Sequence, residues 1–422
     1  MNLPNVHEVV LNNGLRALLV ERRSLPIVAC TIWYRVGSRD ERTSETGLSH
    51  FLEHMMFKGT DRYAKGEIDQ ITSLMGGSNN AFTDNDLTGY YFSLASDRWQ
   101  AALEIEASRM RGCLLDDDEF LAEKSVVLEE LAMGEDDPWN SLFKATESTM
   151  FQVHPYHHPV IGYREDLEKV SAETMRSYYQ RNYGPDHAFL VIVGDIDLGL
   201  TERRIRDLFE SIPATGSDRE PVLAEPAPVG HRRASIRCPG ETFRMTVAVR
   251  TCRMGEPDDF VLDVLSVALA GGKSSRLYQR MVSQLQIVTD VSTYNEPRLD
   301  PGAFWFTFEL CEDVEFAEVE ECLQEEIQKV QEGGLDEDEI RRARTQLESA
   351  FLFEEETALD SAMKIGRWEA QCVGGYKRLA DVDELYGAVD SVAVQAVVER
   401  YFSPDTWNVV HSLPTQEVAS DG

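Results

Sequence analysis

Residues 48–56 read LSHFLEHMM, and this short stretch decides the architecture around it. Apolar side chains recur in it at helical spacing, as Leu48, Phe51, Leu52, Met55 and Met56. At about 100° per residue, this spacing aligns them in one stripe of an amphipathic helix. The same rotation brings His50, Glu53 and His54 together on the opposite face. The stretch therefore predicts a helix over about residues 46–57, with its apolar stripe packed in a core.

The polar face of this helix has the side chains of a zinc site. His50 and His54 are one helical turn apart, so both imidazoles can reach one ion, which zinc binds at about 2.0–2.1 Å. Glu53 lies beside them, where a carboxylate can take the proton of a zinc-bound water and pass it to the leaving amine. The competing interpretation is a solvated polar face that has this composition by chance.

A third zinc ligand is expected from elsewhere in the chain, because a catalytic zinc usually has three protein ligands. The predicted helix over residues 117–133 contains Glu123 and Glu130, which share one face with Val126 and Val127. A carboxylate among apolar neighbours is costly unless it is paired or metal-bound. We therefore expect Glu130 to be the third ligand and Glu123 to support the site without binding the ion. The alternative is that this Glu-rich helix presents only a solvated acidic face.

The rest of the chain indicates two related halves. Strand and helix patterns alternate up to a proline-rich segment at residues 213–230 and then resume. Residues 181–191 resemble residues 400–410 at an offset of 219, with a Pro-Asp pair at the same place in each. A chance similarity over this short window is the alternative. We expect an α+β protein of two similar lobes, divided as residues 1–215, a linker at 216–232, and residues 233–422.

Composition excludes several classes of partner. The formal net charge of −33 argues against nucleic acid or an anionic membrane as the main partner. Seven cysteines without a Cys-x-x-Cys pair do not form the pattern of a secreted disulfide framework. There is no apolar run of transmembrane length, and the first residues lack the features of a signal peptide. A cytoplasmic protein is expected, or a periplasmic one if a leader has been removed.

The zinc-site residues also carry a family resemblance. Residues 50–54 form the inverted motif His-x-x-Glu-His of the inverzincins, with Phe51 and Leu52 inside it and Phe57-Lys-Gly-Thr60 after it. Glu130 stands 76 positions after His54. This combination resembles the insulinase-type metallopeptidases, also called M16 or pitrilysin-like. Residues 271–277, which read GGKSSRL, extend the resemblance into the second half of the chain.

The resemblance implies a zinc metalloendopeptidase that hydrolyses unfolded or short peptides. One Zn²⁺ per chain would be held by His50, His54 and Glu130, with Glu53 as the base and Glu123 as its catalytic support. Residues 76–83 resemble the substrate-binding edge of the family, which assigns peptide binding to Asn80, Ala81, Phe82 and Thr83. The implied fold is that of mitochondrial processing peptidase: two lobes of helices on mainly antiparallel sheets. Two such chains would pair around a peptide chamber.

One departure from the family pattern affects the expected partner. Active relatives carry an Arg and a Tyr seven positions apart after the segment Ser274–Leu277, and both help to hold the substrate and the oxyanion. Val282 and Thr289 occupy those places here. We therefore expect a heterodimer with a related subunit that supplies the Arg–Tyr pair. A homodimer that uses Arg276 or Tyr278 instead is the less favoured alternative.

Two other functions remain open on the sequence alone. The first is a non-catalytic assembly or scaffold subunit of the same family, which the missing Arg–Tyr pair favours. The complete set of His50, Glu53, His54 and Glu130 opposes it, because packing alone does not require all four. The second is a zinc-binding module without hydrolysis, which leaves Glu53 without a role.

Overall fold

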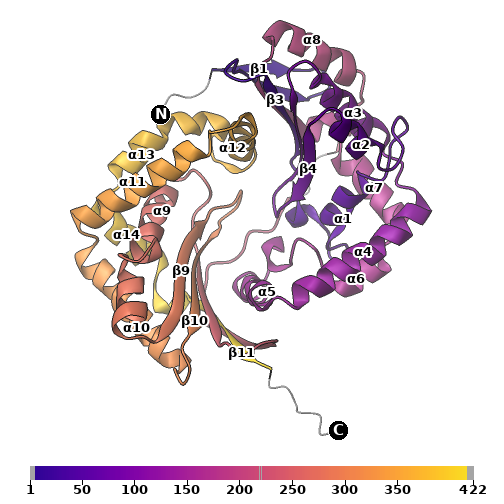
Figure 1. Ribbon diagram of the computed structural model, residues 1–422. Helices are drawn as coiled ribbons and strands as arrows, with labels where there is room; N and C mark the ends of the chain where they lie inside the picture. Colours follow the sequence, from indigo (N-terminus) through magenta and orange to yellow (C-terminus); the bar gives the residue numbers. More distant parts are fainter. Residues whose placement is uncertain (1–4, 218, 220, 416–422) are drawn as a thin grey trace.

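The computed structural model describes residues 5–415 except 218 and 220, and it contains two β-sheets with helices packed on them (Figure 1). The first sheet has six strands: β1 (Val6–Val10), β2 (Arg16–Glu21), β3 (Ile27–Tyr34), β4 (Ser78–Thr83), β5 (Thr88–Ala95) and β6 (Ala188–Gly194). The second sheet has five strands: β7 (Arg232–Cys238), β8 (Arg244–Arg250), β9 (Val288–Glu296), β10 (Ala303–Leu310) and β11 (Asn408–Pro414). Each sheet forms the framework of one lobe.

The two sheets have the same topology once β1 is set aside. Their strand orders are β2-β6-β3-β5-β4 and β7-β11-β8-β10-β9. In each sheet the first of these pairs is parallel and the other three pairs are antiparallel. By position, β9 in the second lobe therefore corresponds to β4 in the first, and both lie on the inner side of the molecule in Figure 1. The predicted α+β architecture of two similar lobes on mainly antiparallel sheets is confirmed.

The helices of the first lobe surround its sheet and position the polar side chains of interest. They are α1 (Leu48–Met55), α2 (Glu67–Leu74), α3 (Gln100–Gly112), α4 (Asp117–Glu135), α5 (Pro138–Met150), α6 (Arg164–Lys169), α7 (Ala172–Asn182) and α8 (Leu198–Phe209), with short turns η1 (Ser38–Asp40), η2 (Pro155–His157) and η3 (Pro185–His187). α1, which carries residues 50–54, contacts α4, α7 and β4. This contact brings the two helices predicted to share a metal next to each other.

The second lobe repeats this arrangement with helices of its own. They are α9 (Pro257–Ala270), α10 (Phe316–Gly333), α11 (Glu337–Phe353), α12 (Ala358–Gln371), α13 (Val382–Ala388) and α14 (Ser391–Tyr401), with η4 (Tyr278–Gln284), η5 (Gly375–Asp381) and η6 (Pro404–Thr406). α7, η3 and β6 follow one another in the first lobe as α14, η6 and β11 do in the second. These are the two segments in which the sequence repeat was found. Within the described residues, no helix is long and apolar enough to cross a membrane.

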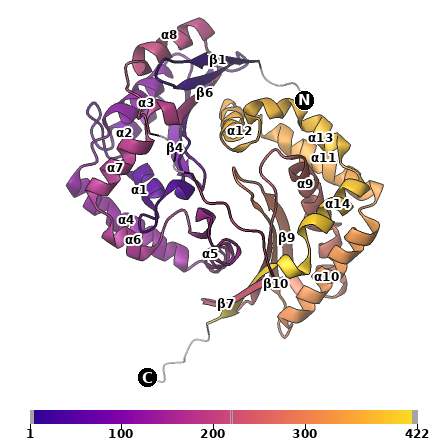
Figure 2. The same ribbon diagram turned by 180° about the vertical axis from the view of Figure 1, so that it is seen from behind.

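The lobes exchange one helix each across their junction, as Figure 2 shows from behind. α12 of the second lobe packs on β3 and β6 of the first sheet, and α5 of the first lobe packs on β7, β8 and β11. At the first of these contacts Gly366 lies against the buried ring of Trp33, and a Cβ at Gly366 would meet that ring at 2.0 Å. No local sequence pattern indicated that either sheet would be covered by a helix from the other half.

The connection between the lobes is fastened to the first of them. From the end of α8 to the start of β7 the described residues, which omit 218 and 220, contain no helix or strand. The Glu225 carboxylate accepts hydrogen bonds from the backbone N–H groups of Gln152, Val153 and His154 at 3.0, 2.7 and 3.0 Å. This connection contains most of the predicted linker at residues 216–232. The lobe boundaries at 215 and 233 stay predictions.

Candidate metal centre

α1 is fixed in place by its apolar stripe and by a glycine. Leu48, Phe51 and Leu52 are each no more than 1% exposed. Gly47 precedes the helix with φ of 88°, and a Cβ there would meet the carbonyl oxygen of Ile161 at 2.4 Å, so the close approach requires glycine. The histidines on the other face stay partly exposed. The helix therefore has the orientation that its periodicity predicts.

α4 brings a carboxylate up to the two histidines. The Nε2 atom of His50 lies 3.6 Å from Oε1 of Glu130, and the Nε2 atom of His54 lies 3.4 Å from Oε2 of the same carboxylate. The ligand atoms of the three residues lie within 4.8 Å of one another. Among the residues that the structure describes, no other group of three or more His, Cys, Asp or Glu side chains is arranged to hold a metal ion.

The spacing of these atoms fits a zinc ion. Ligands at about 2.0–2.1 Å from a tetrahedral zinc are about 3.3 Å apart. The separations of 3.4 and 3.6 Å are close to that value, and they are longer than ordinary hydrogen bonds. Two imidazole nitrogens and a carboxylate oxygen are also a donor set that zinc prefers. The side chains of His50, His54 and Glu130 thus suit the metal that the sequence predicts.

His54 is oriented by a second carboxylate. Its Nδ1 atom lies 3.0 Å from Oε1 of Glu123, which is buried, and Lys58 donates to the other oxygen of that carboxylate at 2.5 Å. Burial would raise the pKa of Glu123, but the hydrogen bonds from Lys58 and His54 outweigh it and hold the pKa below its usual value. An ionised Glu123 places the His54 proton on Nδ1, which leaves the Nε2 lone pair directed at the cluster.

His50 is prepared for metal binding by its surroundings. Burial, followed by the nearby His54, lowers the pKa of His50 to about 4. Its imidazole is therefore neutral at neutral pH, which is the form that binds a metal. Its Nδ1 atom is buried and has no hydrogen-bond partner among the described residues.

Glu53 faces the edge strand of the first sheet. The hydroxyl of Thr83, the last residue of β4, donates to Oε2 of Glu53 at 2.6 Å. Burial raises the pKa of Glu53, and the Thr83 hydrogen bond offsets part of this increase. Glu53 lies on the same helix face as the histidines but is not part of the metal cluster. It therefore lies where a proton acceptor beside these three side chains is expected.

Two features of the site differ from the sequence analysis. The side chain of Glu130 is 47% exposed and Val126 is also 47% exposed, so an apolar setting does not explain why Glu130 faces the histidines. That reasoning applies to Glu123 instead, which is buried beside the fully buried Val127. Lys58 is not among the residues that the sequence predicts; it lies beyond the end of α1 and contacts Glu123 from there.

The predicted peptide-binding residues lie on β4, at the outer edge of the sheet. Thr83 is directed at Glu53, and Ala81 packs against the main core of the first lobe. Phe82 contacts Trp33 with ring centroids 5.3 Å apart, in the cluster beneath α12. Three of the four predicted side chains are thus engaged within the protein, and Asn80 is exposed. Because β4 is an edge strand, its backbone N–H and C=O groups on the side without a neighbouring strand remain available for hydrogen bonds.

The second lobe offers no arginine and tyrosine at the expected places. Val282 lies in η4 and packs against the second core, and Thr289 is an exposed residue of β9. Arg276 is held by two contacts with the Glu339 carboxylate, at 2.5 and 2.6 Å. Tyr278 also packs against the second core. Neither alternative donor is therefore free to turn toward a substrate without breaking a contact.

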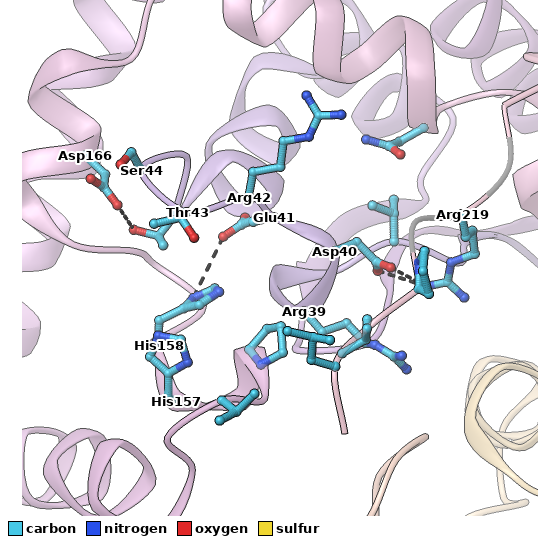
Figure 3. Close-up of a pocket in the computed structure, with 18 of the residues that line it drawn as sticks. Arg39, Asp40, Glu41, Arg42, Thr43, Ser44, His157, His158, Asp166 and Arg219 are labelled. Atoms are coloured by element: carbon cyan, nitrogen blue, oxygen red, sulfur yellow. Dashed lines mark hydrogen bonds and ion pairs between the residues drawn. The ribbon is translucent and has the colours of Figure 1, made fainter. Parts of the chain in front are cut away.

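A cavity of about 620 Å³ lies beside the N-terminal end of α1 (Figure 3). Its lining includes the labelled arginine and acidic side chains Arg39, Arg42, Arg219, Asp40 and Glu41. The Glu41 carboxylate accepts the N–H groups of Gly47 and Ser49 at 2.8 and 2.7 Å, which fixes the start of α1. None of the metal-cluster residues lines this cavity. The cavity therefore lies beside the residues that fix the start of α1, and not beside His50, His54 and Glu130.

Family models match most of the chain. The insulinase model, peptidase family M16, matches residues 16–164, which contain His50, His54 and Glu130. The model for the peptidase M16 inactive domain matches residues 169–347. The second match agrees with the absence of a His-x-x-Glu-His motif after residue 54.

Curated relatives and solved structures extend this similarity. An uncharacterized zinc protease of Streptomyces coelicolor is 29% identical over 396 residues, which cover 92% of this chain and 84% of the relative. Zinc protease PqqE of Helicobacter pylori is 28% identical over 369 residues, which cover 85% and 82%. The crystal structure of a protease from Helicobacter pylori superposes with a TM-score of 0.92 at 25% identity, covering 98% of this chain and all of that one. The chain belongs to the insulinase family, peptidase family M16.

Proposed function

We propose that the protein is a zinc metalloendopeptidase that cleaves unfolded or short peptides. The observation that carries the proposal is the cluster of His50, His54 and Glu130, with ligand atoms within 4.8 Å of one another and Glu53 alongside. The names of the relatives as zinc proteases support the metal and the reaction class. One ion per chain is proposed, because the described residues form one such cluster.

The residues around the cluster divide the chemistry among them. A bound zinc would supply Lewis acidity and lower the pKa of water at the site toward about 7. Glu53 accepts the proton of the attacking water and returns it to the leaving amine. Thr83 holds one Glu53 oxygen at 2.6 Å and leaves the other oxygen for that transfer. Glu123 and Lys58 keep the His54 ring in the tautomer that can bind the ion.

The ligand assignment makes a direct prediction about metal content. His50→Ala and Glu130→Ala should each lose most of the zinc, because two protein ligands rarely hold the ion at neutral pH. Glu123→Gln should keep the ligands but weaken zinc affinity by about 10–100-fold. Elemental analysis and competition with a chelator measure both effects. Glu129→Ala and His231→Ala, at exposed residues outside the cluster, are matched controls, and full zinc in His50→Ala or Glu130→Ala protein would show the assignment to be wrong.

We also propose that the peptide binds as an added strand along β4. Residues 80–83 belong to β4, an edge strand of the first sheet, and the last of them contacts Glu53 through its hydroxyl. Backbone hydrogen bonds along such an edge accept many sequences but require an extended, unfolded substrate. This mode gives Asn80, Ala81, Phe82 and Thr83 their role through main-chain atoms.

The edge-strand proposal can be tested with an inactive enzyme. A crystal of Glu53→Gln protein with a bound peptide should show the peptide hydrogen-bonded to β4. N-methylation of the peptide amides that face β4 should weaken binding at least tenfold, because each methyl group removes a donor and adds bulk at the edge. Methylation of the intervening amides is the matched control. A peptide bound elsewhere in the molecule would refute the proposal.

The partner is proposed to be a second, related chain. Val282 and Thr289 stand where an oxyanion-stabilising Arg and Tyr are expected, and Arg276 is held by Glu339. A subunit that carries the pair would complete the site. The same departure favours a second candidate function, a non-catalytic assembly subunit. The two differ in one measurement: Glu53→Gln in this chain abolishes hydrolysis by the assembled complex only if this chain is catalytic.

A further inference from the structure

Asp86, in the turn between β4 and β5, is a buried carboxylate surrounded by donors. It is 2% exposed. The Tyr156 hydroxyl donates to its Oδ1 at 2.5 Å, and Arg39 Nη1 lies 3.6 Å from the same oxygen. The Leu299 N–H and the Gln371 side-chain amide donate to Oδ2 at 3.0 and 3.1 Å. These donors replace the water that burial removes from both carboxylate oxygens.

The donors come from both lobes. Tyr156 belongs to the first lobe, whereas Leu299 lies between β9 and β10 and Gln371 is the last residue of α12. The contact is continued by Asp300, whose N–H donates to the Tyr156 hydroxyl at 3.2 Å. Asp86 is therefore a point at which the second lobe is hydrogen-bonded to the first lobe, close to the edge strand β4.

The turn that contains Asp86 directly follows Thr83, the residue of β4 that contacts Glu53. Asp84 Oδ1 accepts the N–H groups of Asp86 and Leu87 at 2.7 and 2.9 Å, which makes the turn rigid. Three residues before Asp86, the Thr83 hydroxyl holds Glu53 at 2.6 Å. Hydrogen bonds and the backbone of residues 83–86 thus link the second lobe to the proposed base.

We propose that Asp86 is a positioning residue through which the second lobe holds β4 and, by way of Thr83, Glu53. This inference rests on the proposed function, since it assigns a role in the reaction of that site. The lobes must be correctly joined for Glu53 to be aligned. A shift of about 1 Å in a catalytic group can lower a rate by about 10²-fold, so the contact matters for turnover rather than for metal binding.

The test compares Asp86→Asn with the exposed, matched variant Asp97→Asn. Asparagine replaces one carboxylate oxygen with an NH₂ group. This group cannot accept a hydrogen bond from Tyr156 or Leu299, so the turn should loosen. We expect kcat to fall about 10–100-fold, with one zinc per chain and a KM within about threefold of the parent value. Backbone amides of residues 78–87 should exchange hydrogen faster, while those of β6 stay protected. Asp97→Asn, which loses only a surface contact with Arg98, should change none of these.

A second pair of variants covers a failure of Asp86→Asn to fold. Gln371→Ala removes one donor from the second lobe, and Gln328→Ala, on the exposed face of α10, is its control. Gln371→Ala should show the same changes to a smaller degree. Unchanged kcat, lost zinc, or unchanged exchange of residues 78–87 would overturn the proposal. The exchange result decides it even if no preparation hydrolyses peptides, and Glu53→Gln separately tests the proposed function.

Discussion

Glu53→Gln protein should keep its zinc and lose peptide hydrolysis. Glutamine has the shape of glutamate, and its carbonyl oxygen can still accept the Thr83 hydrogen bond seen at 2.6 Å. The amide cannot accept the proton of an attacking water at neutral pH. Removal of a general base typically costs about 10²–10⁴ in rate. Because Glu53 does not belong to the metal cluster, His50, His54 and Glu130 should bind the ion as before.

Two measurements on the same preparation decide this prediction. Elemental analysis should give equal zinc in the parent and Glu53→Gln proteins, and cleavage of an unstructured fluorogenic peptide should fall by at least two orders of magnitude. Glu129→Gln, on the exposed face of α4, is the control for substitution of a nearby carboxylate. Near-normal cleavage by Glu53→Gln protein would rule out the mechanism. Loss of zinc in that variant would instead make Glu53 part of the metal site.

The sequence predicts which side chains come together at α1 and α4 because most of the pattern is local. The spacing of residues 48–56 determines which side of one helix each residue occupies, and a single turn separates His50 from His54. The apolar stripe then leaves only one way to place the helix on the core. The prediction of Glu130 as the third ligand needed a second helix and the family resemblance, since its 47% exposure carries no burial signal of its own.

Contacts between distant segments explain what the sequence does not show. The Thr83–Glu53 hydrogen bond joins a strand and a helix 30 residues apart, and α12 reaches β3 from more than 300 residues away. The sequence has no periodic pattern that indicates which distant segment either of them contacts. Gly366 is an example. Glycine lowers the stability of a helix, yet at this position there is no room for a Cβ beside the Trp33 ring.

The sequence repeat has more structural content than its length suggests. Only residues 181–191 and 400–410 resemble each other visibly, but apart from β1 the two sheets share their strand order. β4 and β9 therefore occupy corresponding edges, one beside the metal cluster and one carrying Thr289. In the proposed pair of chains, we expect the edge that carries position 289 to supply groups that act on a peptide bound at β4.

The correspondence of β4 and β9 leads to a prediction about the effect of a partner subunit on turnover. This chain alone should hydrolyse an unstructured peptide weakly, and turnover should rise sharply when a related subunit with the Arg–Tyr pair is added. Val282 has no donor, and Thr289 is too short to replace tyrosine. Each absent oxyanion donor can cost about 10²–10³ in rate, so the assembled complex should gain at least a hundredfold. Strong zinc-dependent turnover by a homogeneous preparation of this chain would refute the need for the partner.

Variants of both chains make the test specific. Glu53→Gln in this chain should abolish the turnover of the complex, and alanine in place of the partner's arginine should return it to the level of the isolated chain. The homodimer alternative is tested by Arg276→Ala, which should lower the activity of the isolated chain only if Arg276 leaves Glu339 to act as the donor. Installing both donors here, as Val282→Arg with Thr289→Tyr, should raise the activity of the isolated chain if two copies can pair. Because Thr289 is exposed on β9 and Val282 is half-buried, the tyrosine alone is the better-tolerated first step. A gain from it would place position 289 at the reacting peptide.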